Sequence, residues 1–94
     1  MIVPNSSDSH FRLGAALSDA NRLDEAISEY LESVRLSPRN FKAFNNLGNA
    51  LYAKGRYLDA IKAFENFLAC VPPEHAEHIA RAKERINSMQ SNLN

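Results

Sequence analysis

The fold of this chain is decided by residues 44–73, which read FNNLGNALYAKGRYLDAIKAFENFLACVPP. Apolar residues in the first half recur at the spacing of one face of an α-helix. Gly55 predicts the end of that helix, because glycine adopts the left-handed conformation without a Cβ clash. A second apolar stripe follows and stops at Pro72, since proline lacks the N–H that a helix needs. The stretch therefore predicts two helices joined by a tight turn.

Residues 7–40 and 41–74 carry the same pattern, with a period of 34 residues. Asn21 stands where the second copy has Gly55, and asparagine also tolerates the left-handed conformation at a helix end. A period in this range is typical of stacked helical repeats. The identical positions are nearly all apolar, glycine or proline: Leu13/Leu47, Gly14/Gly48, Ala16/Ala50, Leu17/Leu51, Arg22/Arg56, Ala26/Ala60, Ile27/Ile61 and Pro38/Pro72.

Gly14 and Gly48 fall in the middle of predicted helices, where glycine costs about 1 kcal/mol relative to alanine. A glycine at the same place in both copies indicates a close approach of two helices. We expect Ala26 and Ala60 to be the small residues that face them.

The second copy closely resembles the tetratricopeptide repeat, through Phe44-x-x-Leu47-Gly48-x-x-Leu51, then Ala60-x-x-x-Phe64, then Pro72. The first copy departs from the family at His10, where a large apolar residue is usual. The resemblance implies an all-α fold, an α-solenoid of two helix-turn-helix repeats.

Residues 74–91 do not carry the repeat signature, yet they predict one more helix. Their apolar residues form a single stripe on an otherwise charged segment, as in the polar caps that close repeat arrays. We therefore expect a single domain over residues 1–94, with repeats at 7–40 and 41–74, a capping helix at 74–91, and tails at 1–6 and 92–94.

The resemblance also implies a concave groove, lined by the first helix of each repeat, that holds a peptide or helix of a partner protein. The residues that would line it are Phe11, Arg12, Lys42, Asn45, Asn46, Asn49, Tyr52, Ile79 and Lys83. Phe11 and Tyr52 are the expected anchors, because aromatic side chains contribute much of the energy at interfaces. The alternative is that Phe11 packs beneath the N-terminus and Tyr52 shields a helix end.

The family's clamp for chaperone C-termini is not expected. Phe11 and Ala15 stand where its first Lys and Asn would fall, and Ala76 and Ala80 stand where its last Lys and Arg would fall. We expect no catalytic residues, because no local motif positions a nucleophile with a base and no glycine-rich phosphate loop is present.

No cofactor or metal is expected either. His75 and His78, three residues apart, can share a helix face, but two ligands do not hold a metal ion. A solvated helix N-terminus is the preferred interpretation of this pair.

Net charge is zero, which gives no indication of nucleic acid or a membrane as partner. Cys70 is the one cysteine, so no internal disulfide can form, and the cytoplasm is the default compartment with the periplasm left open. The expected function is that of an adaptor for an unidentified protein or peptide. The alternative is a homodimer formed through the capping helix or the open end, because about three repeats are usually needed for stability.

Overall fold

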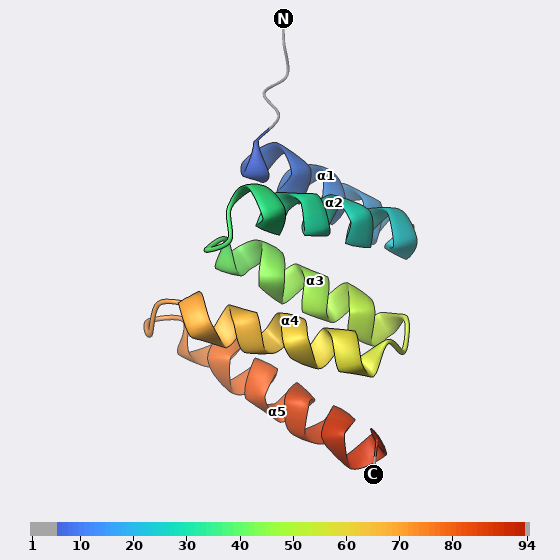
Figure 1. The fold of residues 1–94 in the computed structure, drawn as a ribbon. Helices are drawn as coiled ribbons and strands as arrows, with labels where there is room; N and C mark the ends of the chain where they lie inside the picture. Colours follow the sequence, from blue (N-terminus) through green and yellow to red (C-terminus); the bar gives the residue numbers. More distant parts are fainter. Residues whose placement is uncertain (1–5, 94) are drawn as a thin grey trace, which may run out of the picture.

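A computed structural model describes residues 6–93 of the chain. This part of the chain contains five α-helices and no strand. The helices are α1 (Ser7–Asp19), α2 (Leu23–Leu36), α3 (Phe41–Ala53), α4 (Tyr57–Cys70) and α5 (Ala76–Leu93). They stack in chain order from α1 to α5, and the extensive contacts all join helices that follow one another in the sequence (Figure 1). The predicted all-α solenoid, with two helical hairpins and a C-terminal helix, is confirmed.

The two hairpin turns form where the sequence predicted them, and side chains cap two of the helices. The Ser6 side chain caps α1 by accepting a hydrogen bond from the Ser9 backbone N at 3.1 Å. Asn40 caps α3 in the same way, with its side chain accepting from the Ala43 backbone N at 3.2 Å. The two hairpin turns place Asn21 at φ 61° and Gly55 at φ 77°, the left-handed conformation expected at both.

The nearest side-chain atoms to the two mid-helix glycines belong to aromatic rings, whereas we expected Ala26 and Ala60; the role of the two alanines stays a prediction. A Cβ atom on Gly48 would lie 2.7 Å from the ring of Phe64, and one on Gly14 would lie 2.7 Å from the ring of Tyr30. Each ring stands one helical turn beyond the alanine, on the same buried face. The absence of a Cβ at these glycines therefore leaves space for an aromatic ring of the facing helix, as well as allowing the two helix backbones to lie close together.

The contact that closes each hairpin at its open end differs in chemistry between the two repeats. In the first repeat, the Ser7 hydroxyl donates to the Ser33 carbonyl and the Ser33 hydroxyl donates to the Ser7 carbonyl, both at 2.8 Å. In the second repeat, Phe41 and Phe67 occupy the corresponding positions, 34 residues later, with ring centroids 6.5 Å apart. The same place in the fold thus accepts a hydrogen-bonded pair or an aromatic pair.

Helix α5 covers the C-terminal side of α4 and buries Ala82 and Met89. It runs from Ala76 to Leu93, so starting the helix at residue 74 and placing residues 92 and 93 in a tail were both wrong. Leu93 extends the apolar stripe of Ile86 and Met89 by one more turn, which favours helix over tail. Residue 94 and residues 1–5, which were also assigned to tails, lie outside the described residues.

The two ends of the stack differ in polarity. The outer side of α5 presents exposed charged and polar residues, as a cap should: Glu77, Lys83, Glu84 and Gln90. At the other end, Leu13 on α1 is 49% exposed, whereas its counterpart Leu47 is buried between repeats. None of the helices within residues 6–93 is long and apolar enough to cross a membrane.

Candidate partner-binding groove

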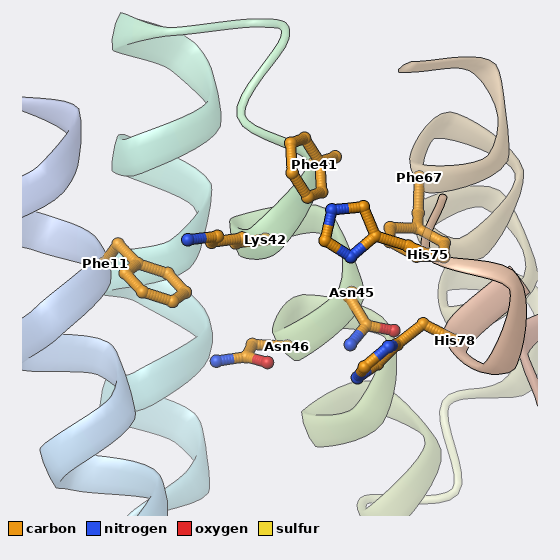
Figure 2. A pocket seen from close by; sticks show the side chains of 8 residues that line it. All are labelled: Phe11, Phe41, Lys42, Asn45, Asn46, Phe67, His75 and His78. Atoms are coloured by element: carbon orange, nitrogen blue, oxygen red, sulfur yellow. The ribbon is translucent and has the colours of Figure 1, made fainter. Parts of the chain in front are cut away.

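A hollow of about 260 Å³ opens between α1, α3 and the start of α5. Figure 2 shows the side chains that line it, with Phe11 projecting from α1 on one side and the two histidines of the α5 region on the other. The full lining is Phe11, Phe41, Lys42, Asn45, Asn46, Phe67, His75 and His78. Residues far apart in the sequence therefore meet on one surface of the solenoid.

Aromatic rings form the apolar part of the hollow. Phe67 is almost fully buried at the base of the hollow, and the Phe41 ring packs against the Phe67 ring. The His75 ring packs on the Phe41 ring with centroids 5.1 Å apart, while Phe11 packs on Tyr30 with centroids 6.2 Å apart. These contacts fix the rings before any ligand arrives, which reduces the entropy lost on binding.

Amide and cationic groups form the polar part. The Asn46 side chain donates to the Tyr30 hydroxyl at 3.4 Å, and burial raises the pKa of that phenol above its ordinary value. Lys42 is exposed at the mouth of the hollow, in the first turn of α3. None of the lining residues is acidic.

A second, smaller hollow of about 190 Å³ lies next to the first, with Asn46 bordering both. Its other lining residues come from α1, α2 and α3: Ala15, Ser18, Asp19, Tyr30 and Asn49. Beyond it, the Arg85 guanidinium donates to the Asn49 side-chain oxygen and lies 5.1 Å from the centre of the Tyr52 ring. Helix α5 is thereby tied to the groove side of α3.

Four of the nine predicted groove residues line the first hollow together: Phe11, Lys42, Asn45 and Asn46. Asn49 lines the second hollow. Arg12 is exposed and forms an ion pair with Asp8 at 2.9 Å.

The other predicted residues, Tyr52, Ile79 and Lys83, border neither hollow. Tyr52 is instead engaged by Arg85 and by the Tyr57 ring at 5.8 Å. Its role as an anchor stays a prediction.

Four lining residues were not predicted from the sequence: Phe41, Phe67, His75 and His78. Comparison of the two repeats contained the signal for the first two, because Phe41 and Phe67 replace Ser7 and Ser33 at equivalent positions. The histidine rings lie 6.2 Å apart, and among residues 6–93 no group of three or more metal-binding side chains gathers around them or elsewhere.

Comparison with known proteins agrees with this geometry. A family model described as "TPR repeat" matches residues 14–55, and one described as "Tetratricopeptide repeat" matches residues 41–73. The chain belongs to the tetratricopeptide repeat family, a class of protein–protein interaction module.

Three curated relatives extend the match along the chain. It is 30% identical over 90 residues to the small glutamine-rich tetratricopeptide repeat-containing protein 2 of Mycosarcoma maydis, covering 94% of this chain and 26% of that protein. It is 33% identical over 82 residues to the peroxisomal targeting signal receptor of Eremothecium gossypii, covering 87% of this chain and 14% of that protein. It is 29% identical over 89 residues to the human protein O-mannosyl-transferase TMTC1, covering 89% of this chain and 10% of that protein. The chain thus spans about a quarter or less of these relatives.

Proposed function

We propose that this chain binds a peptide or a helix of a partner protein in the groove formed by the two hollows, without catalysing a reaction. The observation that carries the proposal is the aromatic lining of the first hollow at Phe11, Phe41 and Phe67. Pre-formed concave sites with an apolar lining and a few polar groups are the usual form of binding sites.

The repeat fold does not require aromatic residues at these places. Phe11 corresponds to Asn45 in the second repeat, and Phe41 corresponds to Ser7 in the first. Both phenylalanines are partly exposed, although the fold accommodates a polar residue at each position. Phe41 packs on Phe67 and Phe11 packs on Tyr30, but both contacts leave the rings partly exposed and therefore available to a ligand.

The relatives fit such a role, since one of them is named as a receptor for a targeting signal. For this chain the partner is a protein or peptide, and the cytoplasm stays the expected compartment.

Two mild substitutions allow a test. Phe11→Asn places in the first repeat the residue that the second carries, and Phe41→Leu removes the ring but keeps an apolar contact with the buried Phe67, so the fold should survive. Proteins captured from a lysate by the wild-type chain should be lost with the double variant. Leu31→Glu is the matched control, because Leu31 is an exposed apolar residue on α2 outside both hollows and corresponds to Glu65. Equal capture by the wild-type chain and the double variant would show that the groove is not the binding surface.

Self-association is the second candidate function, and the exposed Leu13 favours it. Its counterpart Leu47 is 4% exposed because α2 packs on α3, whereas among residues 6–93 no helix covers that side of α1. Two copies that pair through α1 would cover both Leu13 side chains. Leu93 on α5 is also exposed, at 47%, but the other exposed residues of that helix are mostly charged or polar, which makes the capping helix the less favourable end.

Sedimentation equilibrium separates the two candidates. Pairing through α1 predicts a dimer that Leu13→Glu converts to a monomer, with no change in groove binding. A wild-type chain that stays monomeric at high concentration would exclude this second function.

A further inference from the structure

The first hollow has a chemical character that narrows the class of partner, provided that the groove is the binding surface as proposed above. We infer that it takes a large apolar side chain of a peptide in which an adjacent residue is Asp or Glu. The apolar side chain enters among Phe11, Phe41 and Phe67, and the carboxylate meets Lys42.

The size of the hollow suits one large side chain. A cavity of about 150 Å³ is enough to hold a benzene molecule. At about 260 Å³, the hollow has room for a phenylalanine, leucine or methionine side chain together with part of its backbone. Asn45 and Asn46 at its edge each offer an amide donor and acceptor for that backbone.

The charges around the hollow favour an anion beside the apolar group. Lys42 has no ion-pair partner among residues 6–93, and no carboxylate belongs to the lining. The N-termini of α3 and α5 lie next to the hollow, where the helix dipole adds partial positive charge. An aromatic-lined site can also bind a quaternary ammonium, but Lys42 would repel a cation there.

The direction of Lys42 places the carboxylate close to the apolar side chain. Figure 2 shows the lysine extending across the mouth of the hollow toward Phe11. A carboxylate that pairs with this ammonium therefore belongs to a residue next to the one whose side chain enters the hollow.

The carboxylate is assigned to a side chain rather than to a chain end. Asn46 borders both hollows, so a bound peptide can continue from the first into the second. A chain end at Lys42 would leave part of this groove unused.

A random dodecapeptide library displayed on phage, with each peptide fused through its C-terminus, tests this assignment directly. Peptides selected on the wild-type chain should carry Phe, Leu or Met next to Asp or Glu. Selection on Lys42→Glu should replace the acidic residue by Lys or Arg and keep the apolar one. Lys62→Glu, the same change on an exposed residue of α4 outside both hollows, should leave the selected pattern unchanged.

The best peptide, made as a C-terminal amide, gives the quantitative check by fluorescence anisotropy. Its affinity should fall about tenfold when its acidic residue is changed to the amide analogue or when Lys42 is changed to Glu, because a hydrogen bond between charged groups is lost. The amide should bind as well as the free acid. Tighter binding by the free acid than by the amide would show that the hollow prefers a chain end and would overturn the assignment.

Failure of the inference and failure of the proposed function give different results. Peptides that need Phe11 but show no acidic preference, or an acidic preference that Lys42→Glu does not change, would overturn the inference alone. A library from which no Phe11-dependent peptide emerges would overturn the inference, and equal capture from a lysate by the wild-type chain and the double variant would overturn the proposed function as well.

Discussion

Substituting Gly48 by alanine should destabilise this protein, although the same change in most helices has the opposite effect. Alanine is favoured over glycine inside a helix by about 1 kcal/mol. Here the new Cβ atom would lie 2.7–2.8 Å from three carbon atoms of the Phe64 ring. The ring is 1% exposed, so it has no solvent-filled space to move into.

The geometry sets the size of the effect. Ordinary contacts of a Cβ atom begin at 3.4 Å, so the ring would have to move by roughly 0.7 Å as a unit. Overpacking of this kind costs about 1–3 kcal/mol, which exceeds the gain in helix propensity. The expected net loss is about 1 kcal/mol, a fall in the melting temperature of about 4–8 °C for a domain of this size.

Thermal unfolding followed by circular dichroism measures this loss. Gly48→Ala should be repeated in a Phe64→Leu background, where the six-membered ring is absent and the alanine should be neutral or stabilising. The difference between the two backgrounds isolates the contact between Cβ and the ring, as in a double-mutant cycle.

Gly14→Ala offers an independent copy of the experiment, since its Cβ would lie 2.7 Å from the Tyr30 ring. If Gly48→Ala raises the melting temperature in the wild-type background, or costs the same with Phe64→Leu, the steric account of these glycines is wrong.

Three other predictions concern polar groups. Burial raises the pKa of Tyr30 above its ordinary value of about 10, so the unfolded chain releases the phenol proton at a lower pH than the folded chain. The stability of the wild-type protein should therefore fall as the pH rises through that range. In thermal melts between about pH 8 and 11, Tyr30→Phe should lose less stability with rising pH than the wild-type chain. Asn40→Ala removes the cap of α3 and the Asn40 hydrogen bonds to Ser7 at 2.8 Å and Ser33 at 3.2 Å, so urea unfolding should show a loss of about 2 kcal/mol, with Asn40→Asp in between. Arg85→Ala should lower the hydrogen-exchange protection of α5 about tenfold, because the guanidinium links that helix to α3; unchanged protection would show that apolar packing alone holds α5.

The helices and turns could be predicted because local rules determine them. The period of 34 residues reports stacking, and Asn21 and Gly55 satisfy a backbone conformation that few other residues adopt. Leu93 also obeys a local rule, the continuation of an apolar stripe. The prediction ended that helix early because the last residues of the chain were assigned to a tail.

The tertiary contacts were harder to predict because they depend on how far two helix faces are rotated against each other. Ala26 was the expected neighbour of Gly14, but the nearest atoms to a Cβ there belong to Tyr30, one turn further along. The repeat spacing predicts which helix faces a given position, but it does not predict which turn of that helix makes the contact.

Some residues of the first hollow could be predicted from local rules, whereas others depend on tertiary contacts. Phe11, Lys42, Asn45 and Asn46 were predicted because each lies on the first helix of a repeat. Phe67 lies on a second helix and His75 precedes α5, so a rule restricted to first helices omitted them.

The chain-order stacking of the five helices has a mechanical consequence. Since each helix packs chiefly on the next, detaching the helix at one end leaves the packing at the other end intact. A force applied through the two termini would therefore peel helices away one after another. The extension trace should show several small steps in place of a single rupture.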